Sequence, residues 1–379
     1  MQDTELLQDI KHEDLRVFLA DIVSPQIKKE VLNDRMRELE NLVQTYGWLV
    51  LLEKFQRRET PDLKTYIGKG KLQEVIEEMV AMNANLLIIG NILKPRQLYE
   101  ISEQLRPHGI KVRDRVDLIL KIFGKHAEGM EARLQIELAS IKHMWPRIFG
   151  MGLELSRQWG WIGTSGIGET NTERMKRHLQ KKQMKIKKKL LEYEKMRKLH
   201  RQSRKKKNFP TVGIVGYTNA GKSTLLNSLT KKEVLAEDKL FATLWTNIAK
   251  MFVFTDQNKW IGREILLNDT IGFIRDLPPQ LIDAFSSTLE DSIESDVLLH
   301  VIDASDPFIQ ERIQVVNEIL DQIGATQPRF MVFNQIDKIS PEYLWILQKK
   351  FSDPQNQWIS AFQHINLDTL KSFIAEKLA

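Results

Sequence analysis

Short apolar runs and helical patterns alternate along the first third of the chain. The segments whose apolar positions predict strands are Leu15–Val23, Gly47–Phe55, Leu86–Ile89 and Ile110–Val112. The patterns that predict helices are Gly70–Met82, with Leu72, Val75, Ile76 and Met79 on one face, and Pro95–Leu105. This alternation is typical of a small, mostly parallel sheet covered by helices. Residues 1–125 are therefore expected to form an N-terminal α/β subdomain.

The pattern changes between residues 126 and 207. Apolar residues spaced by three or four predict a helix over Ala127–Trp145. Residues 147–170 contain six glycines and no periodicity, which predicts a loop. A second helix is predicted from about Asn171 to Arg204. Together these segments predict a long, coiled-coil-like helical hairpin with a glycine-rich loop at its tip.

Residues 208–379 again alternate between strand and helix patterns. The predicted strands are Thr211–Val215, Lys250–Phe254, Glu264–Asn268, Val297–Asp303 and Phe330–Asn334. A segment of this length fits one doubly wound, mostly parallel α/β domain. The predicted fold class is thus α/β, with a small α/β subdomain and a helical hairpin preceding the doubly wound domain.

Composition narrows the class of protein. A chain of 379 residues is long enough for two or three domains. The absence of cysteine excludes disulfides and thiolate metal sites. The first residues are acidic and no apolar segment follows them, which argues against a secretory signal. No apolar run approaches the length of a membrane span, so we expect a cytoplasmic protein.

Positive charge is concentrated in one segment. The whole chain has a net charge of +6, but Arg174–Lys207 contains 17 Lys and Arg against two Glu, a net charge of +15. The rest of the chain is therefore acidic. Such localised charge favours a polyanionic partner, although a solvated basic helix would show the same composition.

A phosphate-binding motif lies at the start of the predicted doubly wound domain. The spacing G-x-x-x-x-G-K-S runs from Gly216 to Ser223, after a strand pattern and before a helical one. The phosphate loop of nucleotide-binding proteins requires that context. Lys222 would reach the β- and γ-phosphates, and the Ser223 hydroxyl would bind Mg²⁺. The residues assigned to this loop are Gly216, Tyr217, Thr218, Asn219, Ala220, Gly221, Lys222, Ser223 and Thr224.

A second motif follows the predicted strand Glu264–Asn268. An acidic residue at a strand end, followed closely by glycine, is typical of segments that sense the γ-phosphate. Asp269 would hold Mg²⁺ through water, and the Gly272 amide would contact the γ-phosphate. The nucleotide-binding residues assigned here are Asp269, Thr270, Ile271 and Gly272.

Two further positions, Thr243 and Phe273, bear on catalysis. In the segment Phe241, Ala242, Thr243 and Leu244, the Thr243 hydroxyl could close over Mg²⁺, although its position also allows an unrelated loop threonine. Phe273 stands where many GTPases have the glutamine that orients the attacking water. A phenylalanine cannot do this, so we expect slow intrinsic hydrolysis. Lys222, Gly272 and Phe273 are assigned to the catalytic part of the site.

A base-reading motif ends the predicted strand Phe330–Asn334. The Asp337 carboxylate can accept from guanine N1–H and the N2 amino group together, whereas adenine offers no such pair. The motif therefore favours GTP over ATP. A backbone N–H at Ser360–Ala361 could reach guanine O6. The residues assigned to the base are Asn334, Gln335, Asp337, Ser360 and Ala361.

RNA is the polyanion we expect to bind. Phosphates would neutralise the basic helix, and Trp159 and Trp161 could stack on unpaired bases or, alternatively, anchor the loop as core residues. Lys69 precedes the predicted helix Gly70–Met82 and Lys71 lies in its first turn, and both could contact phosphate. The residues assigned to RNA are Trp159, Trp161, Arg174, Lys185, Lys187, Lys188, Lys189, Lys69 and Lys71.

Several blocks together resemble one known family. They are Thr65–Lys71, Asp117–Leu120 through Ala127, Glu131–Ala139, Gly166–Thr170, Gly216–Ser223, Asp269–Pro278 and Ala284–Glu290. In their order and spacing they resemble the HflX family of ribosome-associated GTPases, from about Thr60 to Ala361. The resemblance implies an N-terminal nucleotide-binding-like subdomain followed by a helical hairpin whose tip reaches toward the peptidyl-transferase region.

The resemblance also implies function. Members of this family bind the large ribosomal subunit, can split ribosomes, notably after stress, and hydrolyse GTP faster on the ribosome. By position, Ser223 and Thr243 would be Mg²⁺ ligands, and Asn334, Asp337 and Ser360 would read guanine. Members also have a hydrophobic residue where Phe273 stands.

Three departures from the family pattern concern the nucleotide site. Trp245–Ala249 replaces the usual Asp-Pro-Thr-Thr-Arg, Gln335 replaces a lysine that packs over the base, and Phe362–Ile365 replaces glycines. We expect the segment Trp245–Ala249 to order differently from that of the family, and the loss of the lysine at Gln335 to weaken nucleotide binding.

We interpret the sequence as that of a Mg²⁺-dependent GTPase, expected as a monomer, whose partners are GTP or GDP and the large ribosomal subunit with its RNA. Two alternatives fit the same residues. One is a GTP-dependent regulator of structured RNA outside the ribosome. The other is an adaptor that binds nucleotide but hydrolyses little of it.

Overall fold

The computed structural model describes residues 15–127, 129–159, 167–206, 209–230, 247–256, 259–270, 272–278, 281–282 and 295–378. Contacts between residues divide the chain into two compact units, one made of residues 1–125 and 136–186 and the other of residues 126–135 and 187–379. Each unit is described by itself below. The three-part division expected from the sequence stays a prediction.

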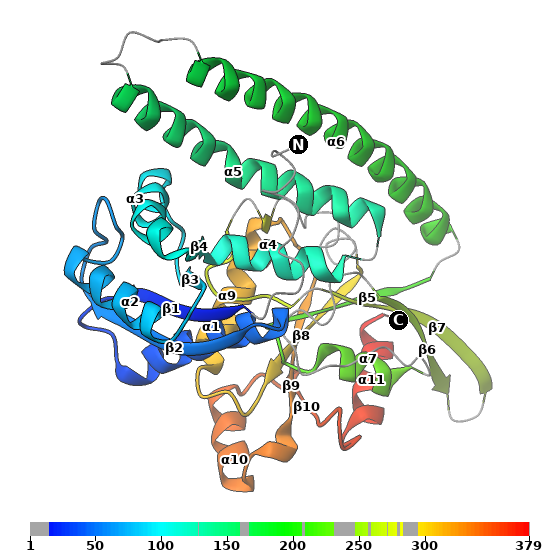
Figure 1. The fold of residues 1–379 in the computed structure, drawn as a ribbon. Coiled ribbons are helices and arrows are strands. Elements are labelled where there is room, and N and C mark those ends of the chain that lie inside the picture. Colours follow the sequence, from blue (N-terminus) through cyan, green and yellow to red (C-terminus); the bar gives the residue numbers. More distant parts are fainter. Residues whose placement is uncertain are drawn as a thin grey trace. The chain divides into compact units, whose positions relative to one another are not determined.

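The first unit contains a four-stranded parallel sheet in the order β2-β1-β3-β4 (Figure 1). Its strands are β1 (Arg16–Val23), β2 (Leu49–Arg57), β3 (Leu86–Ile89) and β4 (Lys111–Asp114). Its helices are α1 (Lys29–Tyr46), α2 (Lys69–Ala81), α3 (Pro95–Leu105) and α4 (Arg115–His126), with a 3-10 turn, η1, over Arg106–His108. The predicted parallel α/β arrangement is confirmed.

Local sequence explains most of these elements. The four apolar residues predicted for one face of α2 are its buried residues, and α3 begins with Pro95, which tolerates the first helical position because its missing N–H has no partner there. No element was predicted over α1 or α4. The apolar residues of α1 do recur at helical spacing, and the helix ends at Gly47, whose φ of +100° suits glycine.

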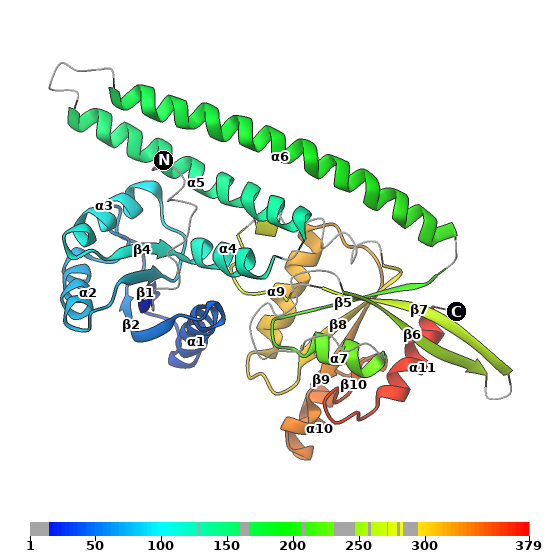
Figure 2. The same cartoon turned by 45° about the vertical axis from the view of Figure 1, so that its right-hand side comes forward.

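The hairpin helices are longer than predicted. Helix α5 spans Met130–Trp159 and α6 spans Ile167–Lys206, and Figures 1 and 2 show them running side by side. The prediction of a loop over residues 147–170 is therefore wrong for most of that range. Extending an existing helix costs less than starting a new one, so α5 continues through Pro146 and two glycines.

Ion pairs support this extension. Arg147, placed in the predicted loop, is a buried residue of α5, and its guanidinium pairs with Asp114 and, at 2.8 Å, with Asp117. His143, one turn earlier, lies 3.3 Å from the Asp114 carboxylate. Across the hairpin, Lys182 pairs with Glu137 at 2.5 Å. The pairs made by Arg147 stabilise a helical backbone beyond residue 145, where the loop was predicted to begin.

The second unit contains a six-stranded sheet in the order β10-β9-β8-β5-β7-β6. Its strands are β5 (Thr211–Gly216), β6 (Asn247–Asp256), β7 (Lys259–Asp269), β8 (Val297–Asp303), β9 (Arg329–Asn334) and β10 (Gln357–Trp358). Among the described strands of this sheet, only β6 pairs antiparallel, with β7, and Figure 2 shows this long hairpin. The doubly wound, mostly parallel fold predicted from the sequence is confirmed.

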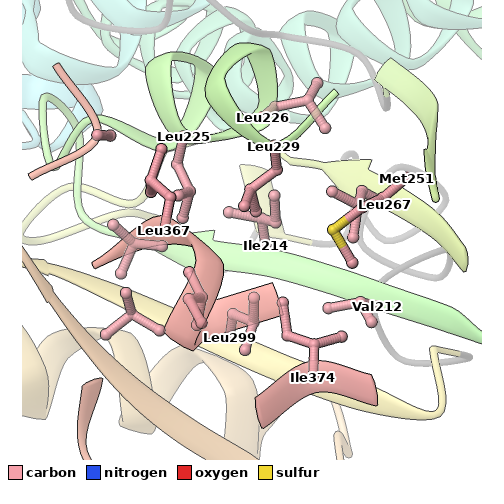
Figure 3. Packing of buried hydrophobic residues seen from close by; sticks show 14 of the residues in the cluster. Val212, Ile214, Leu225, Leu226, Leu229, Met251, Leu267, Leu299, Leu367 and Ile374 are labelled. Atoms are coloured by element: carbon pink, nitrogen blue, oxygen red, sulfur yellow. The ribbon is translucent and has the colours of Figure 1, made fainter. Parts of the chain in front are cut away.

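Helices cover both faces of this sheet. They are α7 (Lys222–Leu229), α9 (Ile309–Gln322), α10 (Pro341–Lys350) and α11 (Leu367–Lys377), with a 3-10 turn, η2, over Ile336–Lys338. Leucines of α7 and α11 pack against β5, β7 and β8 in one buried cluster, which Figure 3 shows. Residues of α9 and α10 form a second cluster with β8 and β9. Among the described helices, none has the length and apolar composition needed to cross a bilayer.

Candidate functional site: a guanine-nucleotide site

The phosphate-loop motif forms the turn between β5 and α7. Strand β5 lies between β8 and β7, and the loop leaves it at the carboxyl end of these parallel strands, where ligands of doubly wound sheets bind. A Cβ at Gly216 would overlap the Val301 carbonyl oxygen, and a Cβ at Gly221, whose φ is +84°, would overlap the Asn334 amide. Both positions therefore require glycine.

Lys222 is buried at the start of α7. Its Nζ donates a hydrogen bond to the Tyr217 carbonyl oxygen at 2.7 Å. Burial lowers the pKa of the Lys222 ammonium from its ordinary value to about 8, while the charge of Asp269 acts in the opposite direction. A buried cation with so few charge partners is stabilised by an anion, and nucleotide phosphates supply one.

Ser223 and Asp269 meet beside the loop. The Ser223 hydroxyl donates to Asp269 Oδ2 at 2.7 Å. Asp269 is fully buried at the end of β7, where it pairs in register with Ile214 of β5. A hydroxyl and a carboxylate at hydrogen-bonding distance provide the kind of oxygen ligands that Mg²⁺ prefers.

The segment after Asp269 lies directly against the phosphate loop. The backbone N–H of Phe273 donates to the Gly216 carbonyl at 3.1 Å, and the N–H of Thr218 donates to the Phe273 carbonyl at 2.8 Å. The Phe273 side chain is 1% exposed. Buried hydrocarbon cannot orient a water molecule, so slow intrinsic hydrolysis stays our prediction.

The base-reading motif lies next to the loop as well. Asn334 donates from Nδ2 to the Ala220 carbonyl at 2.9 Å and accepts from the Ala361 N–H at 2.9 Å. Gln335 donates to the Asn219 carbonyl at 3.0 Å, so this amide makes the connection to the phosphate loop that the expected lysine would make. The connection is retained without the positive charge.

One carboxylate oxygen of Asp337 accepts no hydrogen bond from a described residue. Within the described part of the chain, its Oδ1 is buried and has no hydrogen-bond partner. An unpaired buried acceptor is costly, and the N–H groups of guanine would satisfy it. The Ser360 N–H donates to Ile365 and the Ala361 N–H to Asn334, so both amides proposed for guanine O6 have protein acceptors in this arrangement.

The remaining predicted residues are distributed as follows. Phe241, Ala242, Thr243, Leu244, Ile271 and Trp161 lie outside the described residues, and Trp159 is the last residue of α5. Lys69 is exposed at the start of α2, and Lys71 pairs with Glu74 at 2.6 Å. The residues of α6 assigned to RNA, namely Arg174, Lys185, Lys187, Lys188 and Lys189, are all exposed.

Sequence reasoning missed one group of residues at the site. Tyr217 was assigned to the loop only by position, and Arg275 and Arg312 were given no role, yet all three are buried together. An aromatic residue within the phosphate-loop motif was the one signal available in the sequence.

The strand–loop–helix with its buried lysine, the paired serine and aspartate, and the candidate base-reading carboxylate are features of a P-loop GTPase domain. Three family models match the chain: "GTP-binding GTPase N-terminal" over residues 33–124, "GTP-binding GTPase Middle Region" over residues 126–204, and "50S ribosome-binding GTPase" over residues 211–335. The chain belongs to the HflX family of GTPases, and it hydrolyses GTP.

Curated relatives agree with that assignment. The chain is 41% identical over 377 residues to GTPase HflX of Caldanaerobacter subterraneus, covering 99% of this chain and 83% of that protein. It is 37% identical over 345 residues to GTPase HflX of Escherichia coli, covering 91% and 79%. A crystal structure of SsGBP in complex with GDP matches with a TM-score of 0.52 and 29% identity, covering 96% of this chain and 98% of that one.

Proposed function

We propose that this protein is a Mg²⁺-dependent GTPase that binds the large ribosomal subunit, hydrolyses GTP to GDP and phosphate faster when bound there, and acts in ribosome splitting or recycling. We place it in the cytoplasm as a monomer. Two observations support ribosome binding: the exposed basic surface of α6, and the GTPase domain that follows it in the chain, whose family model is described as 50S ribosome-binding.

Four lysines of this basic surface have no counter-charge among the described residues. Lys185, Lys187, Lys188 and Lys189 are exposed, and within the described ranges none of them forms an ion pair. Four adjacent, unpaired ammonium groups repel one another unless an external anion neutralises them. The phosphates of ribosomal RNA are such anions, which makes RNA the partner that this surface fits best.

Each residue of the nucleotide site would have a separate role in binding Mg²⁺, the phosphates or the base. Ser223 and Asp269 would hold Mg²⁺, directly and through water, with Thr243 as the further predicted ligand. The ion would neutralise charge on the phosphates. Lys222 would bind the β- and γ-phosphates, Gly272 would contact the γ-phosphate through its amide, and Asp337 would select guanine. Phe273 cannot orient water, so a group supplied on the ribosome would complete the site.

GTP turnover with and without ribosomal subunits tests this proposal. We expect slow turnover by the protein with Mg²⁺ alone and stimulation of at least about tenfold by purified large subunits, because Phe273 cannot orient the attacking water. Turnover is measured as phosphate release. Small ribosomal subunits and free structured RNA, added in place of large subunits, are the controls. Equal stimulation by free RNA, or none by large subunits, would contradict the proposal.

Neutralising the basic surface of α6 should weaken RNA binding in a salt-dependent way. Replacing Lys185, Lys187, Lys188 and Lys189 with glutamine is expected to reduce the slope of log affinity against log salt by about three units. Binding of large subunits at several salt concentrations measures this slope. A control that replaces four lysines of the GTPase domain (Lys338, Lys349, Lys350 and Lys371) makes the same change in net charge. An equal change of slope in both variants would rule out a specific role for α6.

A further inference from the structure

Tyr217 joins three parts of the GTPase domain. Its hydroxyl oxygen accepts hydrogen bonds from the backbone N–H of Arg275, at 2.7 Å, and from Arg312 Nη1 of α9, at 3.1 Å. The Arg312 guanidinium also lies over the Tyr217 ring, 4.4 Å from its centroid, in cation–π geometry. One side chain of the phosphate loop is therefore bonded to the segment after Asp269 and to α9.

An acidic residue lies beside each of the two arginines. Arg312 Nε pairs with Asp306 at 3.0 Å, and Arg275 Nε lies 3.4 Å from a Glu311 carboxylate oxygen. Both arginines are buried. Buried charges are tolerated when they are paired in good geometry, and breaking such a pair is costly. The cluster therefore has a defined arrangement rather than a set of interchangeable surface contacts.

The segment after Asp269 also packs against the part of the phosphate loop that would face the γ-phosphate. A Cβ at Gly272 would lie 2.7 Å from Thr218 Cγ2 and 3.0 Å from Lys222 Nζ, so Gly272 is packed against both residues. A γ-phosphate that accepts from Lys222 and from the Gly272 amide needs room between them. A phosphate bound there would push Gly272 away from Lys222 and strain the hydrogen bond that Tyr217 accepts from the Arg275 N–H, three residues further along the chain.

We propose that Tyr217 is a positioning residue that holds residues 272–275 against the phosphate loop and so favours GDP over GTP. GDP has no γ-phosphate and leaves these contacts intact. GTP must stretch them, and the displacement reaches α9 through Arg312. The inference rests on the GTPase site alone and is independent of ribosome binding.

Replacing Tyr217 with phenylalanine tests this role, because the ring stays and only the hydroxyl is lost. We expect the ratio of GTPγS affinity to GDP affinity to shift toward GTPγS by about five- to tenfold, the effect of losing one or two hydrogen bonds that oppose only the triphosphate. The affinity for GDP should change less than about twofold. Calorimetric titration of both nucleotides, without ribosomes, measures the ratio.

Further variants separate positioning from a general structural effect. Arg312→Lys keeps the charge but loses the planar group that contacts both Tyr217 and Asp306, so it should shift the ratio in the same direction. The double variant should show less than the sum of the two shifts, because both act on one cluster. Tyr343→Phe, on exposed Tyr343 of α10, should leave the ratio unchanged. Equal weakening of both nucleotides, or an unchanged ratio in Tyr217→Phe, would overturn the proposal.

Discussion

Replacing Lys222 with alanine is expected to lower stimulated GTP turnover by about 10²–10³-fold, the usual cost of removing a group that stabilises transition-state charge. Lys222 is the buried cation of the phosphate loop, and its ammonium lies next to Gly272. No other described residue places a buried ammonium there. Single-turnover phosphate release with saturating nucleotide measures the chemical step separately from binding.

Folding of the Lys222→Ala variant should not be impaired. Since burial lowers the pKa of Lys222 to about 8, below its ordinary value, the charged form is disfavoured in the folded state. That penalty is fully present below pH 8 and declines as the pH rises toward the ordinary value. Removing the side chain at pH 7 should therefore leave the melting temperature unchanged or higher. Exposed Lys350→Ala is the matched control for turnover, and near-normal turnover in Lys222→Ala would refute the site.

Replacing Asp337 with asparagine should change which base the protein accepts. The carboxylate can accept from both N1–H and the N2 amino group of guanine, whereas the amide of asparagine offers one acceptor and one donor. We expect GTP affinity to fall by about a hundredfold, the cost of two hydrogen bonds to a charged group. Competition binding against ATP and GTP measures the loss of preference.

Xanthosine triphosphate separates altered recognition from damage to the fold. Xanthine keeps N1–H but has a carbonyl in place of the N2 amino group, which matches the donor and acceptor of an amide. Asp337→Asn should therefore bind xanthosine triphosphate more tightly than the unchanged protein does. Asp353→Asn, on exposed Asp353 of the same domain, should alter neither nucleotide. An unchanged preference for GTP in Asp337→Asn would contradict our assignment of the base site.

The local structure of the candidate nucleotide site was predictable because its motifs are short, contiguous stretches. From Gly216 to Ser223, the spacing, the preceding strand and the following helix are all local features of the sequence, and the structure places them as expected. The contact between Ser223 and Asp269 follows from parallel strand order, since the carboxyl ends of neighbouring strands meet at one edge. Gln335 was harder to interpret, because only the geometry shows that its amide reaches Asn219.

Features that depend on distant contacts were not predicted. Glycines and Pro146 weaken a helix locally, so the sequence predicted that α5 ends too early. The ion pairs of Arg147 with Asp117 and Asp114, which are 30 and 33 positions away in the chain, stabilise the helix beyond that point. Tyr217 and Arg312 lie 95 positions apart, so no spacing rule connects them. Sequence patterns report on neighbours along the chain, and these contacts form only when the sheet brings the elements together.

The neutral side chain of Gln335 has a consequence for how the protein responds to ionic conditions. Because an amide rather than an ammonium joins the base-reading segment to the phosphate loop, this connection is not screened by salt. Under the proposed function, the attraction of the exposed α6 lysines to RNA would fall steeply as salt rises. A rise in ion concentration would thus weaken RNA binding while this connection within the nucleotide site persists. Nucleotide occupancy followed through the same salt series as the α6 variant would show whether nucleotide and RNA binding respond separately.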